Sequence, residues 1–489
     1  MRKSTELYNR DAEWGDVTAF ATDPRLGATL ALVYGRRRQG KTLMLELLAE
    51  ATGGFMFTGL QQSDRQNLDA LGRAYAAHLG IPSPTRFDDW IDAIDALLRL
   101  GEDPASPTPV VLDEFPYLAA GGERLPSIIQ NALSPRGRAR RRSRTRLVLC
   151  GSAVTTMRTL LQGNAPLRGR AGTELFVHPF GFREAAGFWG VADSPPVAVR
   201  LHALVGGTPA YKDMCGSAPS GDASFDAWVT ATLLNPSSAM FREGHVLLSE
   251  EPEISDLSVY YSVLSAISWG RTRRGEIAQA LGRKETALGH VLSVLEQTGL
   301  VVRTEDALRR RRTTYLVAEP ILRLHQLVIR PHESRLGRRS GSRVWREVAD
   351  TVAAKIYGPH FEHLAREWCA EHASAATLAG VASEVRPAVL PCTEHREGHE
   401  LDVVVTSAES GGRDTVTAVG EAKWRSTPLA LGQLERLDHL RALLPSAVVR
   451  RPPKLLLFAS SGFTRELRTA ARSRHDVELV DLDRLYRGG

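Results

Sequence analysis

A glycine-rich loop between an apolar run and a helical pattern constrains the fold of this chain more than any other feature. Residues 30–34 are apolar and lead into Gly35-Arg-Arg-Arg-Gln-Gly40-Lys41-Thr42, after which leucines recur at helical spacing. Glycines at the tight points of such a loop let backbone N–H groups surround phosphate oxygens at a helix N-terminus. The pattern therefore predicts a strand, a phosphate-binding loop and a helix within an α/β sheet.

Two side chains at the end of this loop carry distinct chemistry. Lys41 is a point charge for the β- and γ-phosphate oxygens, and the Thr42 hydroxyl is a ligand for Mg²⁺. Lysine is a marked choice here, because only seven of the 62 basic residues are lysines. We predict that the nucleotide is bound by Gly35, Arg36, Arg37, Arg38, Gln39, Gly40, Lys41, Thr42 and Leu43.

A second apolar run, residues 109–112, ends in the carboxylates Asp113 and Glu114. Ligands of open α/β sheets bind at the C-terminal edge of the strands, so both side chains are expected beside the loop. We predict that Asp113 binds the nucleotide through Mg²⁺ and that Glu114 orients or polarises the attacking water. A strand that ends in two acids is often structural, and the preceding phosphate-binding loop is what favours catalysis.

Two further segments add candidates to the same site. A third predicted strand, residues 146–150, leads to Ser152, which is predicted to sense the γ-phosphate or the attacking water. The alternative for Ser152 is a helix cap. Beyond the next helix, Arg168 and Arg170 lie in a loop, and Arg170 is a candidate to neutralise transition-state charge. Because the chain is rich in arginine, a surface role for both remains open.

Length and composition limit the class of protein. A chain of 489 residues with 43% hydrophobic and 24% charged residues is expected to fold into three or four domains. No apolar run approaches the ~18 residues of a membrane span, and the polar start is not a signal peptide. We therefore expect a cytoplasmic protein without a membrane partner. The four cysteines have neither disulfide nor zinc spacing, and the net charge of +6 permits an anionic partner.

A constellation of charges near the C-terminus predicts a second site. Asp402 lies in an apolar run, and a turn separates it from a second run that carries Glu421 and Lys423. Residues two apart on a strand share a face, so the three groups are expected to converge. In a metal-dependent phosphodiesterase, Asp402 and Glu421 would hold one or two Mg²⁺ ions and Lys423 would stabilise charge. The alternative is a surface ion pair between strands.

Between these two sites, residues 257–318 have the pattern of three helices followed by a strand pair. This order predicts a winged helix whose third helix and wing arginines, residues 309–312, contact phosphates. The third helix offers few base-reading side chains, so a docking role between domains is the alternative. A second basic run, residues 136–146, is expected in a solvated loop.

These patterns give an α/β protein with a mostly parallel sheet, followed by smaller modules. The predicted boundaries are 1–198 for the nucleotide-binding core, 199–256 for a helical lid, 257–330 for the winged helix, 331–349 for a linker and 350–489 for a small α/β domain.

Five segments in order resemble the archaeal-type ATPases, P-loop proteins of the AAA-related, STAND-like class: residues 35–42, 112–118, 149–152, 166–170 and 205–211. The resemblance implies ATP and Mg²⁺ as cofactors, although no base-reading motif separates ATP from GTP. Arg168 departs from the family, which favours an aromatic residue there. The class also implies possible homo-oligomers.

The C-terminal domain resembles the PD-(D/E)xK restriction-endonuclease-like fold. This resemblance implies that Glu362, on a preceding helix, joins Asp402 and Glu421 as a metal ligand, with Gln433 as an accessory. It also implies a nucleic-acid partner, DNA rather than RNA. Two hypotheses follow: an ATPase that controls a nuclease-like domain, or a nucleotide-controlled signalling switch, scaffold or DNA-binding regulator whose C-terminal domain does not cleave.

Overall fold

The computed structural model describes residues 1–102, 106–120, 124–251, 253–254, 256–392, 397–408 and 414–489. The chain divides into two compact units. Unit 1 comprises residues 1–179 and 208–210, and unit 2 comprises residues 180–207 and 211–489. Among the helices that the structure describes, none is long and apolar enough to cross a bilayer.

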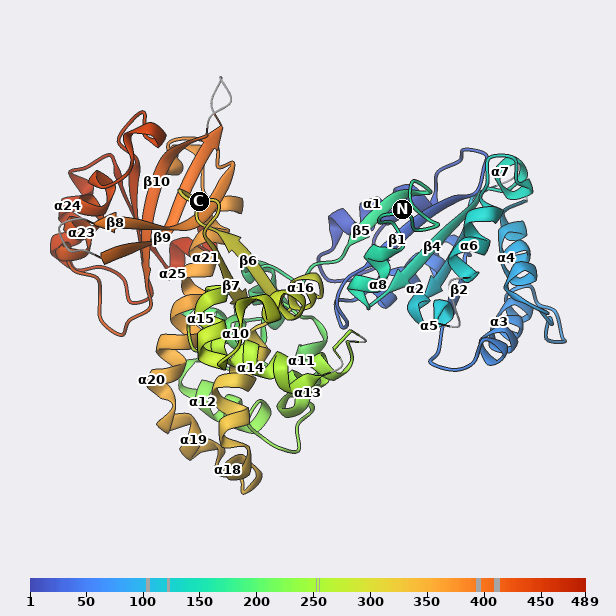
Figure 1. Ribbon diagram of the computed structural model, residues 1–489, viewed down its shortest axis with the longest axis horizontal. Coiled ribbons are helices and arrows are strands. Elements are labelled where there is room, and N and C mark those ends of the chain that lie inside the picture. The colour runs from blue at the N-terminus through green and yellow to red at the C-terminus, as the bar shows by residue number, and fades with distance from the viewer. Residues whose placement is uncertain (103–105, 121–123, 252, 255, 393–396, 409–413) are drawn as a thin grey trace. The chain divides into compact units, whose positions relative to one another are not determined.

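Unit 1 is built on a five-stranded sheet in the order β2-β3-β4-β1-β5 (Figure 1). The strands are β1 (Thr29–Tyr34), β2 (Phe55–Thr58), β3 (Thr108–Asp113), β4 (Thr145–Gly151) and β5 (Ala171–Phe176). All four strand pairs are parallel. This confirms the predicted α/β class and parallel sheet. The C-terminal ends of β1, β3 and β4 therefore meet at one edge.

Helices cover both faces of this sheet (Figure 1). Alternate residues of β1 face opposite layers: Leu30 and Leu32 belong to one core, and Ala31 and Val33 to the other. Burial on both faces explains why these strands are continuous apolar runs in the sequence. The helices are α1 (Asp11–Ala21), α2 (Lys41–Thr52), α3 (Asp64–His78), α4 (Trp90–Arg99), α5 (Phe115–Ala119), α6 (Arg124–Ala132), α7 (Arg138–Arg142) and α8 (Val154–Thr159).

The basic run at residues 136–146 is only in part the solvated loop expected from its charge: Arg136, Arg138 and Arg141 are exposed, but the run also contains helix and strand and a buried arginine. Part of it forms α7, and Arg140 donates to the carbonyl of Ala28 at 2.9 Å. Arg146 is fully buried, and its guanidinium donates to the carbonyls of Asp23 and Gly27 at 2.6 and 2.8 Å. The arginines thus satisfy carbonyl groups of the segment that leads into β1.

Replacing Arg146 with methionine is expected to lower the free energy of unfolding by about 3 kcal/mol or more, because several buried carbonyl groups lose their donors. Urea unfolding followed by circular dichroism measures this loss. Arg141→Met is the matched control, since Arg141 belongs to the same basic run but lies exposed on α7. An equal loss in both variants would contradict the structural role of Arg146.

Unit 2 begins with a group of helices and continues into three helices and an antiparallel hairpin. The helices before the hairpin are α9 (Phe182–Trp189), α10 (Pro195–Val205), α11 (Ala210–Cys215), α12 (Phe225–Thr232), α13 (Ala239–Ser249), α14 (Leu257–Ser268), α15 (Arg274–Leu281) and α16 (Gly289–Gln297). The hairpin pairs β6 (Val301–Glu305) with β7 (Thr313–Val317). This order of elements matches the pattern from which a winged helix is predicted.

The turn of this hairpin contacts the C-terminal sheet of unit 2. Ala307 N donates to the Pro387 carbonyl at 2.9 Å, and Asp306 Oδ2 accepts from Val389 N at 2.9 Å. Arg310, one of the predicted phosphate ligands, is instead 3.9 Å from a carboxylate oxygen of Glu384. These contacts favour the docking alternative for the wing over a phosphate-binding role.

The segment predicted as a linker, residues 331–349, contains helices. Val344 and Trp345 are buried, and Trp345 Nε1 donates to Asp226 Oδ1 at 2.9 Å. Apolar residues within this polar stretch explain why it packs. The helices between the hairpin and the second sheet are α17 (Pro320–Leu324), α18 (Glu333–Gly337), α19 (Gly341–Glu347), α20 (Ala349–Val352), α21 (Gly358–Glu371) and α22 (Ala375–Leu378).

The second sheet has the order β12-β11-β10-β9-β8, antiparallel from β8 to β10 and parallel from β10 to β12 (Figure 1). Its strands are β8 (Glu384–Cys392), β9 (Glu397–Ala408), β10 (Asp414–Lys423), β11 (Lys454–Ala459) and β12 (Val477–Asp481). Helix α21 packs on one face, and α23 (Leu431–Ala442) and α24 (Arg465–Arg472) pack on the other; α25 (Leu482–Arg487) ends the chain.

Candidate functional site

The glycine-rich loop of unit 1 joins β1 to α2. Gly40 is the N-cap of α2 with φ 84°, a left-handed conformation that favours glycine. At Gly35, a Cβ atom would lie 2.4 Å from the carbonyl oxygen of Val177, so glycine is required there by close approach. Arg38 also has a positive φ of 67°. The loop therefore follows a tight path that its two glycines permit.

Lys41 is turned into the loop. Its ammonium donates to the carbonyl oxygens of Gly35 and Arg36, each at 2.8 Å. Burial lowers the pKa of Lys41, although the carboxylates of Asp113 and Glu114 oppose this effect. A buried ammonium gains most from an added anion, so this environment fits a phosphate group.

Thr42 and Asp113 meet across the sheet edge. Thr42 Oγ1, in the first turn of α2, donates to Asp113 Oδ2 at the end of β3, at 2.8 Å. The Asp113 side chain is buried. A hydroxyl and a carboxylate are the hard oxygen ligands that Mg²⁺ prefers, so the two predicted metal ligands fit that ion.

Glu114 is held by a short polar chain. The backbone of Glu114 has a positive φ of 47°. Its two carboxylate oxygens accept from the Ser152 hydroxyl at 3.0 and 3.2 Å. Arg37 Nε lies 3.4 Å from the same hydroxyl, and Arg37 Nη2 donates to the Tyr117 hydroxyl at 2.7 Å. Ala153, not Ser152, is the N-cap of α8, so the hydroxyl contacts the predicted catalytic acid instead of capping the helix.

Two contacts at this edge have no signal in the sequence. Gln39 Nε2 donates to Thr208 Oγ1 at 3.0 Å, and Arg10 Nη2 donates to the Gln39 carbonyl at 3.3 Å. Both pairs lie far apart in the chain, and only the folded unit brings them together. Tyr117 is missed for the same reason.

Arg170 and Leu43 are not brought to this cluster. Ala171, which follows Arg170, pairs with Leu30 at the beginning of β1, whereas the loop follows the end of β1 at Tyr34. Because the strands are parallel, Arg170 lies at the opposite edge of the sheet from the loop of its own chain. The Leu43 side chain is exposed on α2, so the prediction that it contacts nucleotide rests on its backbone.

The second candidate site lies where β9 and β10 run side by side in unit 2. Lys423 Nζ is 3.1 Å from Asp402 Oδ2 and 3.8 Å from Glu421 Oε2. Ala422 N also donates to Asp402 Oδ2 at 2.8 Å. Burial lowers the pKa of Lys423, but the attraction of the two carboxylates outweighs it, so the pKa is raised. The three predicted groups thus surround one point at the end of β10.

Glu421 is a buried carboxylate that has cations nearby but accepts no hydrogen bond among the described residues. It is 1% exposed, and neither of its oxygens accepts a hydrogen bond in the part of the chain that the structure describes. Burial raises its pKa, opposed by Lys423 and by Arg436, whose Nε lies 3.2 Å from Oε1. The sequence does not predict Arg436. Gln433, the predicted accessory, instead accepts from Ala430 N at 3.1 Å and caps α23.

Glu362 lies near this pair but does not complete a ligand set. Burial, and next the charge of Asp402, raises its pKa to about 7. The neighbouring Arg366 donates to the Asp402 carbonyl at 2.8 Å. Within the described ranges, no three His, Cys, Asp or Glu side chains form a group that could hold a metal ion. The site therefore offers two carboxylates, not the predicted three.

Comparisons with known proteins give distant likenesses, and no family model matches the sequence. The chain is 22% identical over 307 residues to an uncharacterized protein of Methanocaldococcus jannaschii, an alignment that covers 62% of this chain and 64% of that relative. Among solved structures, the Walker-type ATPase of Pyrococcus abyssi is 19% identical and has a TM-score of 0.49; the match covers 67% of this chain and 98% of that one. The ORC2 protein of Aeropyrum pernix, solved in ADPNP-ADP complexes, is 15% identical and has a TM-score of 0.45. That match covers 71% of this chain and 97% of that one.

Proposed function

We propose that unit 1 binds ATP with Mg²⁺ and hydrolyses it. The observation that carries the proposal is the 2.8 Å contact between Thr42 and Asp113, directly beside the buried Lys41 ammonium. These residues match the requirements of a phosphate-binding loop with its metal ligands. Titration calorimetry of the full chain with ATP, with and without Mg²⁺, tests it; no heat of binding in either titration would refute it.

The residues divide the chemistry of hydrolysis among them. Lys41 would bind the β- and γ-phosphate oxygens, and Thr42 and Asp113 would hold Mg²⁺, which neutralises charge on those oxygens. A water oxygen attacks the γ-phosphorus while the bond to the bridging oxygen of ADP breaks. Glu114 accepts the proton that this water loses. Ser152 positions Glu114 through the hydrogen bonds at 3.0 and 3.2 Å.

Replacing Glu114 with glutamine is expected to lower phosphate release by about a hundredfold or more while ATP binding persists, because an amide cannot accept the proton. Release of labelled phosphate and retention of labelled ATP on a filter measure the two effects separately. Glu46→Gln, a glutamate in the middle of α2, is the control. Unchanged turnover in Glu114→Gln would remove Glu114 from the mechanism.

For unit 2 we propose a metal-dependent phosphodiesterase site that acts on nucleic acid, with DNA the preferred partner. The observation in its favour is the buried Glu421 carboxylate, which accepts no hydrogen bond in the described residues and shares Lys423 with Asp402. A bound cation would satisfy both acids. Asp402 and Glu421 would hold Mg²⁺, which supplies a hydroxide and binds the scissile phosphate. Glu362 would tune the charge of Asp402.

In the full proposal, the nucleotide state of unit 1 controls the nuclease-like site of unit 2. Incubation of the chain with DNA and RNA, in Mg²⁺ or Mn²⁺ and with or without ATP, tests it directly. Cleavage that depends on ATP supports the coupling. Absence of cleavage under all conditions favours the second candidate, a nucleotide-controlled switch or DNA-binding regulator.

A further inference from the structure

A groove between α14 and α15 has no role in either proposed reaction. It is open to solvent and has a volume of about 520 Å³, within the range of small-ligand sites. Ser258, Ser262, Ser265 and Trp269 follow one another along its α14 side. Their spacing of four, three and four residues places these side chains on one stripe of the helix. The groove therefore has a polar wall with an aromatic ring at one end.

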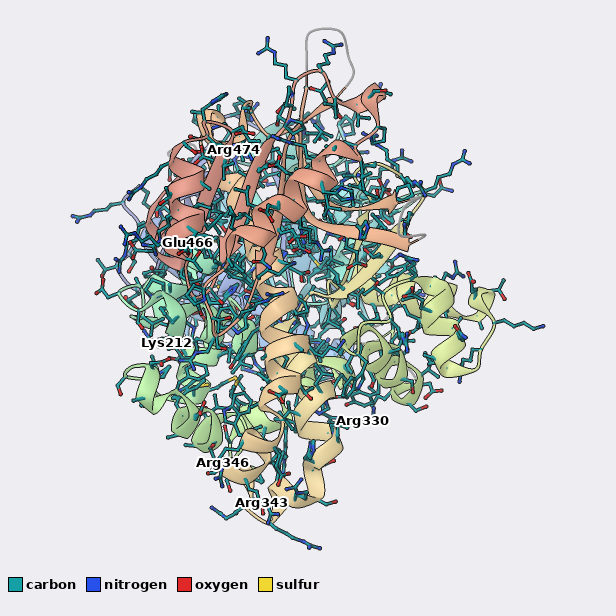
Figure 2. All side chains as sticks on the ribbon, turned by 90° about the vertical axis from the view of Figure 1, so that its left-hand side faces the viewer. Lys212, Arg330, Arg343, Arg346, Glu466 and Arg474 are labelled. Atoms are coloured by element: carbon teal, nitrogen blue, oxygen red, sulfur yellow. The ribbon has the colours of Figure 1, made fainter. Side chains whose placement is uncertain are left out.

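Three arginines give the groove a positive charge. Arg271, Arg283 and Arg330 line it, and in the described part of the chain none of them lies within ion-pair distance of a carboxylate. Asp256 lies near Arg283, but its carboxylate is engaged by Ser258 Oγ and N at 2.8 and 3.1 Å, and these hydrogen bonds lower the pKa of Asp256. The guanidinium carbon of Arg330, a residue labelled in Figure 2, lies 4.7 Å from the centre of the Tyr261 ring. The charge complements an anion.

The rim carries an exposed aromatic residue. Trp269 is 49% exposed, although most large apolar side chains of unit 2 are buried. An exposed indole beside guanidinium groups that have no carboxylate partner among the described residues is typical of grooves that bind single-stranded nucleic acid, since arginines track phosphates and the indole stacks on a base. A duplex keeps its bases stacked inside and presents no base face to Trp269. An acidic peptide would use the arginines but not the indole.

We propose that this groove binds single-stranded nucleic acid, with phosphates at Arg271, Arg283 and Arg330 and a base stacked on Trp269. The hydroxyls of the α14 stripe are the polar partners of base edges or phosphates. The site is separate from the hairpin turn, which contacts the C-terminal sheet. It depends on neither ATP hydrolysis nor cleavage, so it stands if both proposals fail.

Fluorescence anisotropy of a labelled 15-nucleotide oligo-dT, titrated with the full chain, tests the groove. Converting Arg271, Arg283 and Arg330 together to glutamine is expected to weaken binding by about a hundredfold and to reduce the slope of log affinity against log salt by about two. Trp269→Ala is expected to weaken binding about tenfold, whereas Trp269→Phe keeps most of it because phenylalanine still stacks.

The matched control is a triple glutamine variant with the same net charge, made at the exposed residues Arg338, Arg346 and Arg451; Arg346 is labelled in Figure 2. Equal weakening in the two triple variants would overturn the proposal, as would better competition by poly-glutamate or by duplex DNA than by unlabelled oligo-dT. Thermal unfolding confirms that each variant folds. If the groove triple variant unfolds, the affinities of Trp269→Ala and Trp269→Phe test the proposal instead. Equal affinity for oligo-dT in both variants and in the parent would also overturn the proposal.

Discussion

Replacing Lys41 with alanine is expected to weaken ATP binding by at least about a hundredfold and to abolish hydrolysis. The ammonium is buried within the loop and donates to the carbonyls of Gly35 and Arg36. When the triphosphate arrives, the same group can turn to its oxygens and contribute a charge-assisted bond in a poorly solvated site. No other lysine lies in this loop, so nothing replaces it.

Two further variants separate this role from a general effect of charge. Lys41→Arg is expected to fail as well, because a planar guanidinium does not fit the space of a compact ammonium held at 2.8 Å by two carbonyls. Lys212, labelled in Figure 2, lies in unit 2, so Lys212→Ala removes a positive charge away from the loop and should bind ATP normally. Titration calorimetry gives the three affinities. Full affinity in Lys41→Ala would refute the nucleotide site.

The elements of the proposed nucleotide site could be predicted because they are local. The apolar runs before Gly35 and Asp113 fix β1 and β3, and a parallel sheet brings their C-terminal ends together. This topology predicts that Thr42 and Asp113 lie at the same edge of the sheet, where the structure brings them to 2.8 Å. The polar chain through Ser152, Glu114 and Arg37 depends instead on side-chain conformations, which no pattern in the sequence specifies.

Arginines are where sequence patterns were least informative. Arg146 and Arg170 lie in similar basic stretches. Arg146 is buried and donates to backbone carbonyl groups, whereas Arg170 lies at the edge of the sheet away from the glycine-rich loop. The density of charge in the sequence predicts that both side chains face solvent or bind anions. What decides their environment is strand register, a long-range property. Arg436 shows the converse: it contacts Glu421 because α23 packs on β10, which local spacing does not reveal.

The C-terminal site was predicted at the level of its strands and not of its ligand number. The two-residue spacing of Glu421 and Lys423 correctly places both beside Asp402. Glu362 was expected to join them through family resemblance. Its side chain is partly buried near Asp402 but is not part of a three-ligand group in the described residues. The distance between a side chain on a helix and a group on the sheet depends on how closely the helix packs on the sheet and on its rotation about its own axis. Neither can be read from residue spacing.

Substituting Asp402 with asparagine is expected to reduce cleavage of nucleic acid at least about a thousandfold, because the neutral amide both loses a metal ligand and leaves Lys423 without its closest carboxylate. Lys423→Met should lose activity to a similar extent, since it removes the ammonium that contacts both Asp402 and Glu421 and, among the described residues, leaves Glu421 with Arg436 alone. Gel analysis of end-labelled DNA and RNA in Mg²⁺ or Mn²⁺ measures both.

Matched controls make the result specific to the site. Glu435→Gln removes an exposed acid from α23, and Lys454→Met removes the other lysine of the sheet, which pairs with Glu478 at 2.8 Å. Both controls should cleave like the parent, and all four variants should hydrolyse ATP like the parent, since unit 1 is unchanged. Equal cleavage by the parent and by both site variants would assign the activity to a contaminant.

The two variants of unit 1 distinguish ATP binding from ATP hydrolysis as the step that controls cleavage. If cleavage is lost in Lys41→Ala but kept in Glu114→Gln, ATP binding controls the nuclease-like site, before hydrolysis.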